Sequence, residues 1–307
     1  MAFEHYIRSG QKMLRCGYTT GTCAALAASG AARLLLLGEM PETLSLPTPK
    51  GWTVEVCPEG LARTKDGAVC SVRKDGGDDA DVTHGMLVTA LVRRTEEPGV
   101  RIDGGEGVGR VTRPGLDQPV GAAAINHVPR QMIAQAVENV CREAGYAGGV
   151  EVIVSIPGGE ERAKRTFNPL LGIEGGLSVL GTSGIVEPMS EQAIVDTIAV
   201  EVRQAAQTSR RLILTPGNYG ADFLAAHGLD GLGVPVVRCS NFIGDALDMA
   251  AAEGFAQVLL AGHIGKLVKL AGGIMNTHSR QADGRCELFC AHAAVAGASR
   301  GLCARLM

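Results

Sequence analysis

Four short polar turns in the C-terminal half of the chain carry residue types that suit ligand binding. They lie at residues 181–184, 215–218, 240–241 and 262–266, and each follows a short run of apolar residues. In open α/β sheets, ligands bind beyond the carboxyl ends of the strands, where the N–H groups of the next helix favour anions. Gly, Asn and Ser are also ordinary loop residues, so one such turn would mean little, but four together favour a ligand-binding edge.

A loop at residues 74–85 concentrates four aspartates with His84. Carboxylate oxygens suit a hard cation, but the spacing is not that of an EF-hand and no Glu closes the loop. A solvated turn and a functional loop therefore both stay open. If the loop is functional, Asp81 or His84 could accept a proton.

Residues 105–109 have the G-x-G-x-G spacing of nucleotide-type sites and follow a possible strand at residues 100–102. Such a motif needs a helix next, and residues 110–115 are not helical. We therefore reject a dinucleotide site or a standard Rossmann methyltransferase site at this loop, although its glycines could let Glu106 approach a ligand. No Walker A motif is present.

Further polar side chains could hold acidic groups. Arg130 and Lys266 could bind carboxylates, Arg in bidentate fashion. Asn126 and the run Asn276-Thr277-His278-Ser279 are additional polar clusters.

The elements that position these residues differ between the two parts of the chain. An Ala/Leu-rich helix follows residues 19–22, with Thr20 or Thr22 as its N-cap, after an irregular polar lead at residues 1–14. Alternating and β-branched segments in residues 43–103 predict a mostly antiparallel region, and a helix follows Pro129. Continuous apolar strands at residues 177–180, 212–214, 234–237 and 258–260 alternate with helices, which is typical of a parallel sheet covered on both faces. The predicted fold class is α/β, with an α+β domain at residues 1–174 and a Rossmann-like parallel α/β domain at residues 175–307.

Composition excludes several classes of function. The net charge of −3 and the 4 % aromatic content argue against nucleic-acid binding. No stretch is long and apolar enough to span a membrane, and no signal peptide is apparent. The nine cysteines form no CxxC pair, so we expect reduced thiols, a cytoplasmic location and no protein metal site.

Taken in order along the chain, these motifs resemble the CbiD family, the cobalt-precorrin-5B C1-methyltransferases of anaerobic cobalamin (vitamin B12) biosynthesis. The resemblance covers nearly the whole chain, although members of the family usually continue beyond the position of Met307. The matching stretches are residues 17–25, 74–85, 105–109, 111–112, 124–130, 166–168, 180–189, 216–218, 240–242, 262–266 and 276–279.

The resemblance implies S-adenosylmethionine as the methyl donor and methylation of C-1 of cobalt-precorrin-5B to give cobalt-precorrin-6A. The cobalt then belongs to the tetrapyrrole substrate. Transfer from a sulfonium to carbon is an in-line displacement, so positioning and exclusion of water are the main demands.

We expect the donor over the C-terminal strand ends and the macrocycle between the domains. The candidate donor-binding residues are Thr182, Ser183, Gly184, Asn218, Asn241 and Gly262. The candidate substrate-binding residues are Thr19, Thr20, Thr22, Asn126, Arg130, Lys266, Asn276 and His278. The candidates for proton transfer are His84, Glu106 and His263.

Two other functions stay open on the sequence alone. One is a corrinoid-binding carrier or scaffold without catalysis, and the other is a dinucleotide-dependent oxidoreductase, against which the missing G-x-G-x-x-G turn counts. Association into a homo-oligomer is a further open possibility.

Overall fold

The chain divides into two units, residues 1–190 and 191–307. The structure, a computed structural model, describes residues 3–9, 11–169, 171–217 and 219–307. Residues 175–190, which the sequence assigns to the second domain, lie in the first unit. They do so because β13 (Ile185–Val186) pairs antiparallel with β3 (Gly17–Tyr18).

A five-stranded sheet forms the centre of the first unit, in the order β6-β7-β8-β11-β9. Its pairings are antiparallel except that of β11 with β9, so the prediction of a mostly antiparallel region is confirmed. The strands are β6 (Glu59–Arg63), β7 (Ala68–Arg73), β8 (Leu87–Thr95), β9 (Val100–Gly104) and β11 (Gly149–Ser155).

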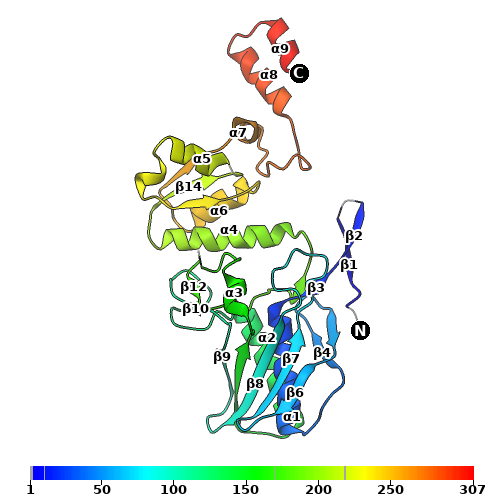
Figure 1. The fold of residues 1–307 in the computed structure, drawn as a ribbon. Coiled ribbons are helices and arrows are strands. Elements are labelled where there is room, and N and C mark those ends of the chain that lie inside the picture. The colour runs from blue at the N-terminus through cyan, green and yellow to red at the C-terminus, as the bar shows by residue number, and fades with distance from the viewer. Residues whose placement is uncertain (1–2, 10, 170, 218) are drawn as a thin grey trace. The chain divides into compact units, whose positions relative to one another are not determined.

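Two long helices pack against this sheet and against each other, α1 (Thr20–Leu36) and α2 (His127–Glu143) (Figure 1). Alternate residues of β7, β8 and β11 are buried, among them Cys70, Ala90 and Val152. These side chains meet the alanines of α1, whose small size lets helix and sheet approach closely. The N-cap of α1 is Thr19, one residue before the expected Thr20, and its hydroxyl accepts a hydrogen bond from the Thr22 N–H.

Shorter elements complete the first unit. Residues 1–14 were expected to be irregular, but β1 and β2 form an antiparallel hairpin there. The remaining elements are β1 (Tyr6–Ser9), β2 (Lys12–Arg15), β4 (Leu44–Pro47), β5 (Thr53–Val56), β10 (Arg110–Val111), β12 (Ile173–Glu174) and α3 (Gly159–Ala163).

The second unit contains a parallel three-stranded sheet in the order β15-β14-β16, as its apolar strands predicted. Leu212, Leu214 and Val237 pack against α4 and α6 on one face, while Ile213 packs against Leu224 of α5 on the other. The elements are α4 (Glu191–Ala206), β14 (Arg211–Thr215), α5 (Tyr219–Ala226), a 3-10 turn (Asp230–Leu232), β15 (Val236–Arg238), α6 (Ile243–Ala252) and β16 (Gln257–Leu260).

Residues 177–180 are not a strand of this parallel sheet, contrary to the prediction. Leu177 and Val179 form isolated bridges with Val108 and Ile125 in the first unit. The side chains of Leu177 and Val179 are buried in the core of the first unit instead, whereas that of Leu180 is exposed.

Three helices follow β16: α7 (Ile264–Leu270), α8 (Arg285–Val295) and α9 (Arg300–Leu306). No residue of α8 or α9 is buried. Among the helices of the described residues, none is long and apolar enough to cross a membrane.

The cysteines are all unpaired, and their exposure varies. Cys16, Cys23, Cys70 and Cys239 are buried, as core thiols should be, whereas Cys57 and Cys286 are exposed. Burial raises the pKa of the Cys23 thiol to about 12 and that of Cys239 to about 11. These two thiols therefore stay protonated near neutral pH.

Candidate functional site

Polar residues from three turns gather at the carboxyl edge of the parallel sheet in the second unit. We call Thr215, Gly217, Asn241, His263 and Lys266 the strand-end cluster. Thr215 ends β14, and Gly217 and Asn241 lie in the turns that follow β14 and β15. His263 is the N-cap of α7, which follows β16, and Lys266 lies in the first turn of that helix. Parallel strands end at a common edge, so three of the four predicted turns come together as expected. Asn218, the fourth residue of the β14 turn, lies outside the described residues.

Lys266 supplies the positive charge of the strand-end cluster. Its ammonium donates to Asn241 Oδ1 at 2.9 Å and lies 3.5 Å from the Ser240 carbonyl oxygen. Burial lowers the pKa of Lys266 below its ordinary value. Within the described part of the chain, no carboxylate forms an ion pair with it, so the charge is half-buried without an anionic partner.

The turn after β14 leaves room for that ammonium. A Cβ added to Gly217 would lie 3.2 Å from Lys266 Nζ, and the φ angle of Gly217 is +85°. Any other residue there would crowd the lysine and strain the backbone. The positive φ angle is therefore what requires glycine here, since the end of the flexible lysine could shift slightly.

Thr215 has a buried hydroxyl without a hydrogen-bond partner among the described residues. The side chain is 0 % exposed. A buried polar group without a partner is costly, and such groups call for a specific explanation such as a functional role. Ser240 adds local backbone strain, because its φ of +52° is unusual for a residue other than glycine.

His263 caps α7, and this fixes the role of each ring nitrogen. Nδ1 accepts a hydrogen bond from the Gly265 N–H at 3.1 Å. In the neutral imidazole the proton must then be on Nε2, which leaves His263 as a donor to a ligand and not as a base. Its exposed ring lies 6.5 Å, between centroids, from that of Tyr219.

The predicted Asn276 and His278 lie in a loop that is fastened to the same cluster. Thr277 donates its N–H to the Asn241 carbonyl oxygen at 2.9 Å. Asn276 Oδ1 accepts from the His278 N–H, and His278 Nδ1 accepts from the Arg280 N–H. Both side chains therefore shape the loop internally.

Lys269 is a residue of this region that the sequence analysis missed. Its side chain is 2 % exposed, and Nζ donates to the carbonyl oxygens of Thr277 and Ala282 at 3.2 and 2.8 Å. The sequence did contain a pattern that could have drawn attention to Lys269. It is a second lysine, one helical turn after Lys266, in a helix without acidic residues. Lys269 holds the loop in place, while Lys266 remains available to a ligand.

The turn at residues 181–184 lies in the first unit, so it does not join the other three turns at the sheet edge. Gly184 accepts hydrogen bonds at its carbonyl oxygen from the Thr19 N–H and the Thr22 hydroxyl. Ser183 Oγ donates to the Ile185 carbonyl oxygen. Of the three candidate donor-binding residues here, Thr182 has an exposed side chain.

Thr19, Thr20 and Thr22 are buried beneath this turn. The Thr20 hydroxyl exchanges hydrogen bonds with the backbone of Leu180 at 3.0 and 3.3 Å, and the Gly21 N–H donates to the Leu180 carbonyl oxygen. Their hydroxyls are thus occupied by the chain itself. They position residues 180–184, which are what a ligand would meet at this end of α1.

The aspartate-rich loop holds the first unit together. Asp75 accepts two hydrogen bonds from Arg15, Asp79 accepts from the Met189 N–H, and Asp81 pairs with the buried Lys74 at 2.7 Å. His84 is exposed, and its Nδ1 accepts from the Gly76 N–H at 3.0 Å. No group of three potential metal ligands occurs among the described residues. Of the two interpretations, the contacts favour a structural loop.

The glycines at residues 105–109 are explained by packing within the chain. A Cβ on Gly107 would lie 1.9 Å from the Ile156 carbonyl oxygen, and one on Gly105 would lie 2.4 Å from Ser155 Oγ. The spacing therefore serves close backbone contacts. Glu106 is exposed at the tip of this loop.

Arg130 is engaged by the backbone. Its guanidinium donates to the carbonyl oxygens of Ile125, Ile102 and Ala123 at 2.8, 2.9 and 3.4 Å. Burial lowers the pKa of Arg130 from its usual value. The side chain therefore fastens the start of α2 to β9, and little of its donor capacity is left for a substrate carboxylate. Asn126, the N-cap of α2, makes no side-chain capping bond.

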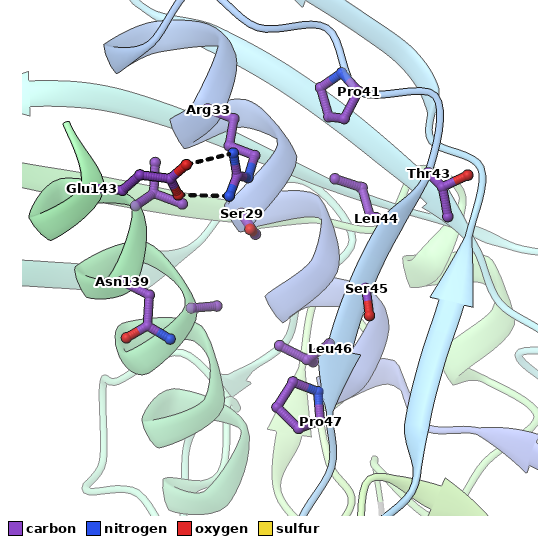
Figure 2. A pocket seen from close by; sticks show the side chains of 12 residues that line it. Ser29, Arg33, Pro41, Thr43, Leu44, Ser45, Leu46, Pro47, Asn139 and Glu143 are labelled. Atoms are coloured by element: carbon purple, nitrogen blue, oxygen red, sulfur yellow. Dashed lines mark hydrogen bonds and ion pairs between the residues drawn. The ribbon is translucent and has the colours of Figure 1, made fainter.

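A surface pocket of about 390 Å³ lies elsewhere in the first unit, between α1, α2 and β4. Figure 2 shows Arg33 joined to Glu143 on one side of it, opposite residues of β4. The two charges offset each other, and none of the candidate residues lines this pocket. Its lining residues are Ser29, Arg33, Pro41, Thr43, Leu44, Ser45, Leu46, Pro47, Ala136, Asn139, Val140 and Glu143.

Comparison with known proteins identifies the family. The CbiD family pattern matches residues 7–188, and that of the CbiD C-terminal domain matches residues 276–307. The chain belongs to the CbiD family. The first CbiD match spans nearly all of the first unit, and the second begins at Asn276, in the loop fastened to the strand-end cluster.

Several relatives are similar over almost the whole chain. A cobalt-precorrin-5B C(1)-methyltransferase of Ruminiclostridium cellulolyticum is 50 % identical over 97 % of this chain and 77 % of its own length. That of Alkaliphilus metalliredigens is 46 % identical over 99 % of this chain and 80 % of its own length. A solved structure, the cobalamin biosynthesis protein CbiD of Archaeoglobus fulgidus, is 30 % identical over 90 % of this chain and 86 % of its own, with a TM-score of 0.48.

Proposed function

We propose that this protein transfers a methyl group from S-adenosylmethionine to C-1 of cobalt-precorrin-5B, giving cobalt-precorrin-6A in cobalamin biosynthesis. The observation that carries the proposal is the similarity to cobalt-precorrin-5B C(1)-methyltransferases at up to 50 % identity over nearly the whole chain. Membership of the CbiD family supports it independently of any single relative. The cobalt-containing tetrapyrrole is the second substrate, and the predicted cytoplasmic location suits a biosynthetic step.

The strand-end cluster is the proposed donor site. Asn241 and Gly262 follow β15 and β16, the two strands that flank β14, at the edge where α/β folds bind ligands. The buried Thr215 hydroxyl without a described partner supports this placement. Thr182, Ser183 and Gly184 receive less support, because their turn lies in the first unit and is largely bonded to the start of α1.

Few groups are suited to proton transfer. Glu106 and His84 are exposed in the first unit, whereas His263 faces the strand-end cluster as an Nε2–H donor. His84 also accepts a backbone N–H at Nδ1, so its neutral ring, like that of His263, presents only an Nε2–H donor. We assign His263 the role of a ligand-orienting donor, and we keep Glu106 as the candidate base and His84 as a candidate donor through Nε2. The chemistry itself is a displacement at the methyl carbon, for which alignment of donor and acceptor supplies most of the rate enhancement.

Substrate carboxylates need cations or free N–H groups. Among the candidate cations, Lys266 is the one whose donors are not taken up by carboxylates or by several carbonyl oxygens. Its closest polar contact is the Asn241 amide oxygen. Asn126, Asn276 and His278 stay proposals as neutral polar contacts. The buried threonines and Arg130 act indirectly, by holding residues 180–184 and the start of α2 in position.

The test is a methyl-transfer assay with the purified chain. S-Adenosylmethionine carrying an isotopically labelled methyl group is incubated with cobalt-precorrin-5B, and the corrinoid is analysed by mass spectrometry and NMR. Label on C-1 supports the proposal. Corrinoid binding without transfer of label would instead indicate a carrier, and binding of NAD(P) with no binding of S-adenosylmethionine would indicate an oxidoreductase.

A further inference from the structure

The turns that follow β14 and β16 approach each other at two points in the second unit. At the first, the Lys266 ammonium lies over Gly217. At the second, the ring of His263 lies 6.5 Å from that of Tyr219. Lys266 and His263 belong to one helical turn, as the Lys266 N–H donates to the His263 carbonyl oxygen at 2.9 Å. One face therefore carries a positive charge and an aromatic pair side by side.

The Lys266 ammonium is held in a position where it can pair with one anionic group. Asn241 holds the Lys266 ammonium from one side, and Asn241 is itself fixed by Thr277, whose hydroxyl lies 3.3 Å from the same amide oxygen. The ammonium is thus pre-positioned. Lys269, the other lysine of α7, is buried against two carbonyl oxygens and cannot turn toward the same ligand. A carboxylate at Lys266 would gain a charge-assisted hydrogen bond without reorganising the protein.

The aromatic pair is open to a planar ring. Tyr219 is 75 % exposed, and neighbouring Ile264 is 59 % exposed. Large exposed aromatic side chains beside a polar site commonly stack on ligand rings. One cation and one ring platform at short range suit a small ligand with one carboxylate and one heterocycle, whereas a macrocycle with many carboxylates would call for several cations.

We infer that the strand-end cluster binds the S-adenosyl ligand in one orientation, with its amino-acid carboxylate on Lys266 and its adenine ring against Tyr219 and His263. This assignment rests on the proposed function and specifies which end of the donor each turn recognises. It also moves Lys266 from the macrocycle to the donor.

The test compares two ligands, of which one lacks the amino-acid end whose carboxylate is assigned to Lys266. S-Adenosylhomocysteine carries the amino-acid carboxylate, and 5′-methylthioadenosine keeps the adenosine and sulfur but lacks it. For the full chain with Lys266→Met, we expect titration calorimetry to show about tenfold to a hundredfold weaker binding of S-adenosylhomocysteine. Binding of 5′-methylthioadenosine should stay within about twofold, because this ligand has no carboxylate to pair with Lys266. Tyr219→Ala should weaken both ligands together.

The matched control is Lys164→Met, which removes an exposed lysine that pairs with Glu161 in the first unit. It should leave both affinities unchanged, and circular dichroism confirms that each variant is folded. Equal losses of both ligands in Lys266→Met, or a loss confined to the corrinoid KM, would overturn the assignment. If the unaltered chain transfers label but Lys266→Met binds S-adenosylhomocysteine normally, the assignment alone fails. If the unaltered chain neither binds S-adenosylhomocysteine nor transfers label, the proposed function fails with it.

Discussion

The Lys74 ammonium lies inside the first unit with Asp81 as its counter-charge. The lysine side chain is 1 % exposed and the aspartate side chain 17 %. Asp81 also accepts hydrogen bonds from the N–H and hydroxyl of Thr83, so both its oxygens are used. The ion pair joins Lys74 and Asp81, near the two ends of the aspartate-rich loop. Removal of the Asp81 charge would leave the buried Lys74 ammonium without a counter-charge.

We therefore predict that Asp81→Asn lowers the free energy of unfolding by about 3 kcal/mol, the cost of breaking a buried ion pair. Urea denaturation followed by the fluorescence of Trp52 measures this, because Trp52 is the single tryptophan and lies in the first unit. The matched control is Glu59→Gln, which breaks the exposed pair with Arg73 and should cost at most about 1 kcal/mol. Similar losses in the two variants would contradict a special role for the buried pair.

The same pair should make the first unit sensitive to acid. Burial raises the pKa of the Asp81 carboxyl, but the charge and hydrogen bonds of Lys74 and Thr83 outweigh burial and hold the pKa below its ordinary value. A pKa lowered by folding contributes stability above the unfolded value of about 3.9 and loses it as the pH falls through the folded value. Denaturation at a series of pH values should show stability falling below about pH 5, more steeply than in Asp81→Asn. Parallel pH profiles would refute this origin.

At the scale of elements, the loop between β9 and β10 depends on backbone contacts that only glycine permits. Gly107 has a φ of +72°, and its carbonyl group packs against Gly159 and Gly176. The carbonyl oxygen also accepts a hydrogen bond from the Leu177 N–H. These contacts fix residues 157–159 and 175–177 against one loop.

We predict that Gly107→Ala destabilises the first unit several times more than Gly121→Ala. Gly121 also has a positive φ, +89°, but a Cβ there would meet nothing within 4 Å, so its substitution should cost about 1 kcal/mol from backbone strain alone. Gly107→Ala adds a collision with the Ile156 carbonyl oxygen. Thermal unfolding followed by Trp52 fluorescence compares the two, and equal midpoints would show that the loop adjusts.

Local patterns predicted the elements better than they predicted which sheet each segment joins. The apolar strands β14, β15 and β16, and the polar turns after them, followed from run length and turn residues. Residues 177–180 carry the same apolar pattern yet pair with Val108 and Ile125, because bridge partners are set by packing distant in sequence. The glycines at residues 105–109 misled for a related reason: the same spacing serves approach to a ligand or to the chain's own backbone.

Within the candidate site, residue types were easier to predict than their contacts. Lys266 and Asn241 do meet at the sheet edge, as strand-end logic suggested. Arg130, an equally plausible cation in sequence, is bound to three carbonyl oxygens. Lys269 and Thr215 could not be singled out, since their importance depends on burial and on hydrogen-bond partners.

At the scale of the whole molecule, the candidate donor residues fall in both units, and one measurement separates them. We predict that S-adenosylhomocysteine slows amide hydrogen exchange in peptides covering residues 240–242 and 262–266, because ligand contacts stabilise those turns against local opening. Peptides covering residues 180–184 should exchange unchanged. Mass spectrometry of the full chain reads both regions in one experiment, and protection confined to residues 180–184 would place the donor in the first unit.

The uneven exposure of the cysteines has a practical consequence. Cys57 in the first unit and Cys286 in the second are exposed, while the most deeply buried thiols remain protonated near neutral pH. Maleimide dyes should therefore react first at one position in each unit. A donor and acceptor dye placed there would report, by energy transfer in single molecules, how the separation of the two units changes as methyl donor and corrinoid are added in turn.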